Sequence, residues 1–261
     1  MIRLGVCTKP ENMALLASQG FEYIEIGLAW LHGLTEEEYK EQRKLIDASP
    51  IAVEVTNLML PGTIRVTGPE VDEAAIHTYL DEAFRRAHEI GVKVSVFGSG
   101  GARRVPEGWS HAEAWRQIAR YLTIANDYCE KYDIDIAIEP LRRVECNIMN
   151  FVTEGTLMSS LLNFKRIGTL GDTYHMRCGY EPYSAFIQAG DRLRHVHIGH
   201  TLGVDAGRIW PAPDDGENYR EIFEALEAAG YNGRVSIEAS CDDMAVDGAK
   251  AFAVLDQARR G

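Results

Sequence analysis

The sequence lacks several features that would place it in a membrane or outside the cell. None of its 261 residues lie in an uncharged apolar run approaching the roughly 18 residues that a membrane helix needs. The opening residues, MIRLGVCTKPENM, contain no apolar segment of signal-peptide length, so we expect a cytoplasmic protein. Cysteines are few, odd in number and never spaced as C-x-x-C, which predicts free thiols, most of them buried as small apolar side chains. They are Cys7, Cys129, Cys146, Cys178 and Cys241.

The sequence also has fewer positively charged residues than negatively charged ones. The chain has 27 Lys and Arg residues against 39 Asp and Glu residues, a formal net charge of −12. Such a surface repels phosphate backbones and anionic membranes, so we expect neither nucleic acid nor membrane as a partner. Apolar residues make up 46% of the chain, enough for a large core.

One sequence pattern recurs along the chain: an amphipathic segment, a glycine, and then a short apolar strand. It appears as LLASQGFEYIEI, AHEIGVKVSVF, IQAGDRLRHVHI and EAAGYNGRVSIE. The glycines stand where a helix ends in a left-handed residue, and the strands are rich in Val and Ile, which is typical of strands covered on both faces. The predicted strands are 2–6, 22–26, 51–57, 92–97, 134–139, 166–171, 193–198 and 234–238.

Eight strands alternating with helices, with a last helix near 243–259 and no linker, predict a (β/α)8 TIM barrel. We expect residues 1–261 to form a single domain. An open doubly wound sheet is the alternative fold. The sequence has no G-x-G-x-x-G after the first strand to support that sheet, so the barrel is favoured.

Charged side chains end the last four predicted strands, where the active sites of such barrels lie. They are Glu139 in AIEP, Asp172 in LGDTYH, His197 in HVHIGH and Glu238 in SIEAS, separated by 33, 25 and 41 residues. A single strand-end carboxylate is more often a helix cap or a surface ion pair. Three carboxylates and an imidazole converging on one rim instead require a cation. Their oxygen-rich set suits Mn²⁺, Mg²⁺ or Co²⁺.

These segments carry a resemblance that covers essentially the whole chain. IEPLRRVE, GDTYHM, HVHIG and VSIEAS resemble the xylose-isomerase-like barrel superfamily of sugar isomerases and epimerases, in its D-tagatose/D-psicose 3-epimerase branch. The resemblance implies one divalent metal held by Glu139, Asp172, His197 and Glu238. Mn²⁺ is expected first, with Mg²⁺, Co²⁺ or Zn²⁺ as alternatives.

The resemblance also implies a reaction. The family's two metal-binding glutamates act as acid and base on a ketose through a cis-enediolate, which assigns the catalytic roles to Glu139 and Glu238. The metal would stabilise the negative charge that develops on the carbonyl oxygen. A small carbohydrate is the expected substrate. A homodimer or homotetramer is the expected assembly.

Candidate substrate-binding residues follow from the same resemblance. Glu145 matches a glutamate that contacts the first carbons of the substrate, and His175 matches a histidine that hydrogen-bonds a substrate oxygen. Arg143 matches an arginine near the metal glutamate. The alternatives are a surface histidine and a solvated loop cation.

Two segments depart from the family pattern. Arg142 stands where the epimerases carry Asn, and after the HxG stretch His200 and Gly203 replace a glutamate and an arginine. Arg208, further along the loop, is the candidate to replace that arginine in binding the substrate. The substrate therefore stays open among a keto sugar, a sugar phosphate, a keto-inositol and an oxidised glycoside.

The glycine-rich stretch FGSGGARR places Gly98, Gly100 and Gly101 before Arg103 and Arg104 on the same rim. A turn of this kind can bind a phosphate or a carboxylate, although a flexible loop with solvated arginines is the more common case. Trp109 could cover the apolar face of a sugar or pack at a helix start.

Other functions fit the same scaffold. An inosose dehydratase, or a C-glycoside-cleaving subunit with a small partner chain, would be a lyase using the same ligands. An apurinic endonuclease would need further histidines on the early strands, where the chain reads EVTN and VFGSGG. A catalytically idle binding subunit would not need all four ligands and both bases.

Overall fold

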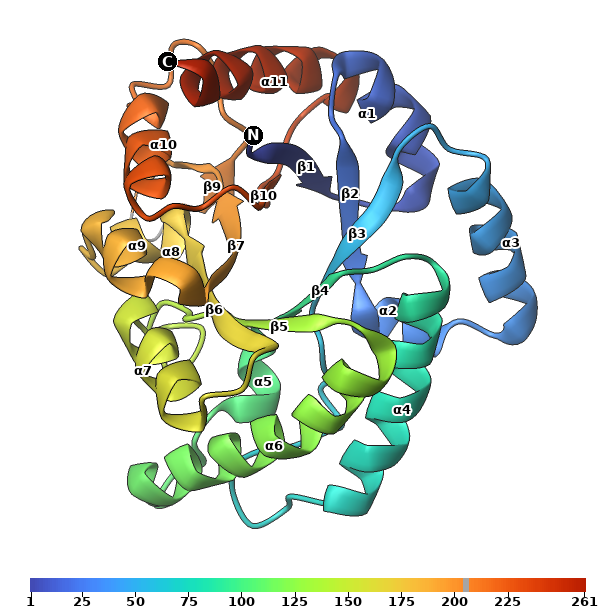
Figure 1. The fold of residues 1–261 in the computed structure, drawn as a ribbon, viewed down its shortest axis with the longest axis vertical. Helices are drawn as coiled ribbons and strands as arrows, with labels where there is room; N and C mark the ends of the chain where they lie inside the picture. Colours follow the sequence, from blue (N-terminus) through green and yellow to red (C-terminus); the bar gives the residue numbers. More distant parts are fainter. Residues whose placement is uncertain (204–206) are drawn as a thin grey trace.

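The chain folds into a closed barrel of eight parallel strands, as the sequence predicts (Figure 1). The computed structural model describes residues 1–203 and 207–261. Around the barrel the strands follow one another as β1-β10-β7-β6-β5-β4-β3-β2. They are β1 (Arg3–Cys7), β2 (Tyr23–Gly27), β3 (Ala52–Asn57), β4 (Val94–Phe97), β5 (Asp135–Ile138), β6 (Ile167–Asp172), β7 (Leu193–Ile198) and β10 (Arg234–Ile237).

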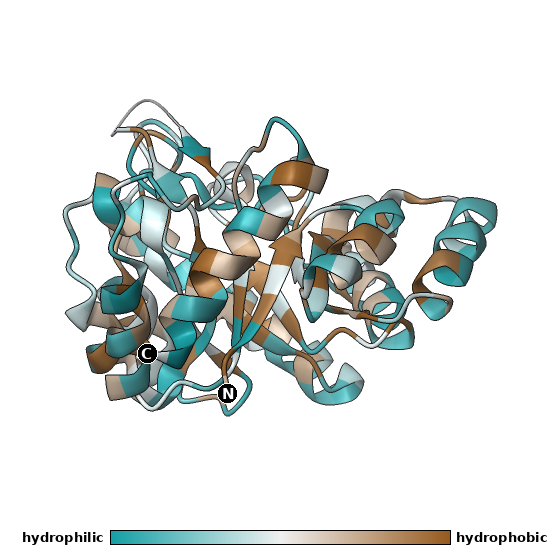
Figure 2. Ribbon diagram, turned by 90° about the horizontal axis from the view of Figure 1, so that it is seen from above, coloured by the Kyte–Doolittle hydropathy of each residue, from teal (hydrophilic) through white to brown (hydrophobic). Residues whose placement is uncertain are grey.

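Helices surround the barrel and bury apolar residues against the strands, whose apolar residues appear brown at the centre of Figure 2. Several begin at polar side chains that accept from the first free amides, among them Thr35, Asp72 and Ser110. The helices are η1 (Pro10–Asn12), α1 (Met13–Gln19), α2 (Leu28–Gly33), α3 (Glu36–Asp47), α4 (Glu73–Glu89), α5 (Gly100–Arg103), α6 (His111–Tyr132), α7 (Val152–Leu162), α8 (Thr173–Cys178), α9 (Ser184–Ala189), η2 (Gly190–Arg192), α10 (Tyr219–Ala228) and α11 (Met244–Arg260).

A short antiparallel hairpin follows β7 and was not predicted from the sequence. It consists of β8 (His200–Thr201) and β9 (Arg208–Ile209), and Ile209 also bridges to Ser240 beyond β10. Residues 204–206, which come between β8 and β9 in the sequence, lie outside the described residues. Since β9 returns toward the end of β10, the hairpin brings Arg208 back over the barrel rim.

The core has two parts. A large apolar cluster fills the space between the strands and the surrounding helices. A small cluster lies inside the barrel and consists of Tyr23, Val55, Val94, Val96, Ala137 and Leu170. Polar side chains occupy the rest of the interior, toward the carboxyl ends of the strands. The chemistry of the protein is concentrated there.

Among the residues described, no helix combines the length and the apolar character needed to cross a membrane. None of the five cysteines, all of which lie in the described part of the chain, forms a disulfide bond. Cys129 and Cys146 are buried as predicted, but Cys7, Cys178 and Cys241 are partly exposed. The prediction that most of them are buried is therefore wrong, because these three lie at or just beyond the ends of strands or helices on the exposed rim.

Candidate active site

The carboxyl ends of β5, β6, β7 and β10 meet at one rim and carry the four predicted ligands. Asp172 is the last residue of β6 and is paired in register with His197 on β7. Glu139 and Glu238 directly follow β5 and β10, and their amides still bond neighbouring strand carbonyls at 3.2 and 3.1 Å. The barrel ladder, more than any loop, therefore positions all four side chains.

The four side chains converge on one point. One donor atom from each of Glu139, Asp172, His197 and Glu238 can be chosen so that all lie within 4.8 Å of one another. Nδ1 of His197 is 3.1 Å from Oε1 of Glu139 and 3.0 Å from Oε2 of Glu238. Glu139, Asp172 and His197 are buried and Glu238 is half-buried. The sequence prediction placed these four together correctly.

The electrostatics of the cluster reflect its concentration of negative charge. Burial would lower the pKa of His197, but the carboxylates of Glu238 and Glu25 raise it well above its ordinary value. Burial and the charge of Glu238 raise the pKa of Glu139. Burial opposes ionisation of Glu238 as well, yet His197 and Arg208 lower its pKa. The two glutamates thus have pKa values shifted in opposite directions within one site.

Arg208 enters this cluster from the hairpin. Its guanidinium pairs with Oδ2 of Asp172 and lies 2.7 Å from Oε2 of Glu238. Burial alone would raise the pKa of Asp172, but Arg208 and His175 lower it to about 2. The suggestion that Arg208 returns to the site from further along the loop therefore agrees with the structure.

The donor set fits a divalent metal. Three carboxylates and one imidazole within 4.8 Å bring more negative charge than Arg208 and His197 can balance in a buried site. Oxygen donors with a single nitrogen suit a hard or borderline cation such as Mn²⁺, Mg²⁺ or Co²⁺. Glu139, Asp172, His197 and Glu238 are thus the residues that would hold it.

Two of the predicted substrate-binding residues lie beside the cluster. His175, on α8, is buried, and its Nε2 is 3.5 Å from Oδ2 of Asp172 and 4.0 Å from Oε2 of Glu145. Glu145 also accepts from Nε of Arg142 at 2.6 Å. His175 is therefore no surface histidine, and Arg142 holds Glu145 at the rim of the site.

Arg143 lies elsewhere. Its guanidinium carbon is 5.7 Å from the centre of the Phe151 ring, and its side chain is exposed. Together with Arg142, Phe151 and Tyr180 it lines a separate cavity of about 310 Å³. The structure thus brings Glu145, His175 and Arg208 to the four-residue cluster or its rim and places Arg143 at the edge of this neighbouring cavity.

The arginines after the glycine-rich stretch do not form a phosphate site. Arg103 is fully buried and donates to the carbonyl oxygens of Phe97 and Glu139. Arg104 donates to the carbonyl of Glu145 at 2.7 Å. Both guanidinium groups therefore hold the backbone that carries Glu139 and Glu145.

Trp109 donates to Gln117 at 3.1 Å, and its ring packs against the core.

Sequence analysis missed three residues of this site. Glu25 on β2 and His195 on β7 are fully buried in the barrel interior, directly beside His197. Cys7, at the end of β1, offers a thiol to the same region, since Cys7, Glu25 and His197 have donor atoms within 4.8 Å. The sequence YIEIG already indicated Glu25, because a carboxylate within an apolar strand needs a partner for its charge, as Glu139 does at the end of AIE.

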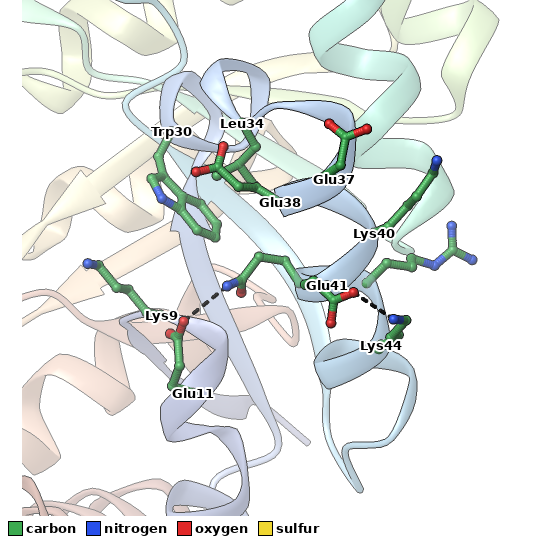
Figure 3. Close-up of a pocket in the computed structure, with 11 residues that line it drawn as sticks. Lys9, Glu11, Trp30, Leu34, Glu37, Glu38, Lys40, Glu41 and Lys44 are labelled. Atoms are coloured by element: carbon green, nitrogen blue, oxygen red, sulfur yellow. Dashed lines mark hydrogen bonds and ion pairs between the residues drawn. The ribbon is translucent and has the colours of Figure 1, made fainter.

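A larger groove of about 750 Å³ lies outside the barrel, between η1 and α3 (Figure 3). Its walls are mostly charged side chains: Lys44 pairs with Glu41 at 2.6 Å, and the neutral amide of Gln42 donates to Glu11 at 3.1 Å. Trp30 and Leu34 form its apolar end. Among the described residues, these groups do not form a candidate ligand set, so the cluster of Glu139, Asp172, His197 and Glu238 remains the candidate for chemistry.

The chain matches a known family over most of its length. The sequence model of the family described as "Xylose isomerase-like TIM barrel" matches residues 13–258. An L-ribulose 3-epimerase from Methylomonas sp. (strain DH-1) is 27% identical over 239 residues, covering 85% of this chain and 75% of the relative. A fructoselysine 3-epimerase from Escherichia coli O157:H7 is 28% identical over 126 residues, covering 48% of this chain and 45% of the relative.

Solved structures share the fold over the full chain. A D-psicose 3-epimerase crystallised with D-fructose superposes with a TM-score of 0.86 at 17% identity, covering 100% of both chains. A 3-keto-D-glucoside 4-epimerase from E. coli superposes with a TM-score of 0.80 at 19% identity, covering 98% of this chain and 100% of that one.

Proposed function

The chain belongs to the xylose isomerase-like TIM-barrel family, and from this premise we propose that it is a divalent-metal-dependent ketose 3-epimerase or a closely similar keto-sugar isomerase. The convergence of four donor groups on four strand ends carries the proposal. Matched relatives that are ketose 3-epimerases support the class of reaction. Mn²⁺ is the proposed ion. A homodimer or homotetramer is proposed from the family resemblance alone.

Glu139 and Glu238 are the proposed acid and base. They come from β5 and β10, which lie on different sides of β7, and both reach Nδ1 of His197 from separate directions. A bound metal would supply positive charge to stabilise the developing charge on the substrate's carbonyl oxygen. One glutamate would remove the proton beside the carbonyl to leave a cis-enediolate. The other would return a proton to the opposite face, which inverts that carbon.

Three further residues are proposed to orient the sugar. Glu145 would accept from a substrate hydroxyl, since the hydrogen bond from Arg142 holds its carboxylate in place. His175 and Arg208, both within reach of Asp172, would donate to substrate oxygens beside the metal. Arg143 is proposed to reach only the far end of a longer substrate, because its cavity lies beyond Glu145.

Deuterium exchange tests this proposal. Metal-loaded protein would be incubated in D₂O with a panel of ketoses, including L-ribulose, D-psicose and D-fructose, with a 3-keto-glucoside and with keto-inositols. We expect deuterium at the carbon next to the carbonyl and an epimeric product. Glu139→Gln and Glu238→Gln should each abolish exchange, because each removes one of the two proton carriers while keeping the size of the side chain.

The product mass separates the two classes of reaction. An isomer of unchanged mass identifies an epimerase or isomerase, whereas loss of water or of an aglycone identifies a lyase on the same scaffold. Absence of bound metal in the purified, Mn²⁺-incubated protein would overturn the proposed function. Exchange that persists in both glutamine variants would overturn the proposed roles of Glu139 and Glu238.

A further inference from the structure

A further carboxylate, in addition to the three of the four-ligand cluster, is fully buried inside the barrel below that cluster. Glu25 on β2 is not one of the four ligands, yet both of its oxygens are engaged. Oε1 lies 3.0 Å from Nε2 of His197, and Oε2 lies 2.9 Å from Nε2 of His195. An ionised carboxylate is costly to bury unless donors satisfy it, and these two imidazole N–H groups supply that compensation.

The contact with Glu25 determines which nitrogen of His197 faces the other three residues of the four-ligand cluster. A carboxylate only accepts hydrogen bonds, so Nε2 of His197 must carry a proton. Its other nitrogen, Nδ1, then points between Oε1 of Glu139 and Oε2 of Glu238, at 3.1 and 3.0 Å. With Nε2–H fixed, Nδ1 is the nitrogen whose lone pair is available to a cation.

His195 holds the other end of the same carboxylate. It lies two residues before His197 on β7, so both rings face the barrel interior, edge to face at 5.0 Å between centroids. Nε2 of His195 is also 3.1 Å from Oγ of Ser236, which in turn lies 2.9 Å from the hydroxyl of Tyr23. All of these groups are fully buried, so Glu25 has little freedom to turn away from His197.

We propose that Glu25, braced by His195, is a positioning residue of the metal centre, which fixes the ring orientation and tautomer of His197 so that Nδ1 serves as the ligand. The inference rests on the proposed function in taking His197 as a metal ligand. It adds a role for two residues outside the four-ligand set, and it predicts that metal binding itself depends on them.

The test uses Glu25→Gln in the full-length protein and reads metal binding before any turnover. The introduced amide can accept from one imidazole through its oxygen, but its NH₂ group then opposes the N–H of the other. We expect the Mn²⁺ dissociation constant, measured by EPR titration, to rise about 10- to 100-fold. The visible absorption of the Co²⁺-loaded protein should change as well, because the ligand geometry around the ion changes.

A matched control separates positioning from stability. Glu54 on β3 is also a nearly buried strand carboxylate, but it pairs with Arg3 and Arg234, away from the cluster. Glu54→Gln should leave the Mn²⁺ dissociation constant within about two-fold of the wild-type value, whatever its effect on melting temperature. His195→Gln retains an N–H donor toward Glu25 and should bind Mn²⁺ better than His195→Phe, which has none.

The outcomes are distinct. Weaker Mn²⁺ binding and an altered Co²⁺ spectrum in Glu25→Gln, with both unchanged in Glu54→Gln, support the proposal. Unchanged binding and spectrum in a folded Glu25→Gln protein would overturn it and leave the proposed function standing. If Glu25→Gln does not fold, equal Mn²⁺ affinities of the two His195 variants would overturn it. If the wild-type protein binds neither ion, the metal centre and this inference fall together.

Discussion

The backbone of Gly98 lies directly against the carboxylate of Glu139, and a Cβ atom on residue 98 would collide with Oε2 of that glutamate. Gly98 follows β4, the strand beside β5, so the space that Glu139 needs is left open by the neighbouring strand. The first glycine of the glycine-rich stretch thus makes room for the carboxylate of Glu139, one of the four candidate ligands.

Gly98→Ala should therefore displace Glu139 and weaken both metal binding and catalysis. Shifts of about 1 Å at a reacting group cost on the order of 100-fold in rate, so we expect a loss of that size in kcat/KM. The control is Gly101→Ala on the adjoining helix α5, where an added Cβ would meet nothing within 4 Å. Equal activities of the two variants would show that Glu139 does not need this space.

Arg208 should matter most when no metal is bound. Without it, the carboxylates of Asp172 and Glu238 lose a neutralising partner in a mostly buried site. We expect Arg208→Gln to lower the free energy of unfolding of the EDTA-treated protein by about 2 kcal/mol. This is less than the roughly 3–5 kcal/mol of a fully buried pair, because the Arg208 side chain is 22% exposed.

Chemical denaturation with and without Mn²⁺ measures that effect. The stabilisation that Mn²⁺ provides should be larger in Arg208→Gln than in the wild-type protein, since the ion then takes over the neutralising role. Arg43→Gln is the control, because Arg43 and Asp47 form an exposed pair on α3 that contributes little. A metal-free Arg208→Gln protein as stable as the wild type would contradict this account.

Acid should destabilise the metal-free protein in a defined range of pH. Asp172 has an ordinary pKa of 3.8 and a folded-state pKa of about 2. Because the unfolded chain binds this proton more readily, the contribution is complete above pH 3.8 and is lost as the pH falls through about 2. Urea titrations in EDTA should show this loss in the wild type and a weaker one in Asp172→Asn. Parallel curves for the two proteins would rule it out.

Glu145 and Arg143 should differ sharply as substrate contacts. A hydrogen bond to a charged group contributes about 1.5–3 kcal/mol, so Glu145→Gln should lower kcat/KM by roughly 10- to 100-fold. Arg143→Ala should change kcat/KM for an unsubstituted ketose by less than about three-fold, because Arg143 lies over Phe151. Steady-state kinetics on the same sugar measure both. A large effect of Arg143→Ala on that small substrate would mean that the Arg143 side chain reaches the four-ligand cluster.

The eight strands and the four candidate ligands could be predicted from local pattern. Each ligand ends an apolar run, and the spacing of one strand–helix unit brings such ends to a common rim in a parallel barrel. Glu139 was found because a carboxylate ending AIE has no local compensation. Eight strand predictions agree with the observed strands to within two residues at each end.

What the sequence by itself determined is therefore the period of its strands and helices and the residue types that end the strands. The tertiary structure decided what these side chains touch. The carboxylate of Glu25 is satisfied by hydrogen bonds with two histidines that lie 170 and 172 residues further along the chain. Arg208 reaches Asp172 because a hairpin turns it back, and Arg143 turns away from the site although its neighbour Arg142 does not. Such contacts depend on closure of the barrel, which joins β1 to β10 and which no local pattern encodes.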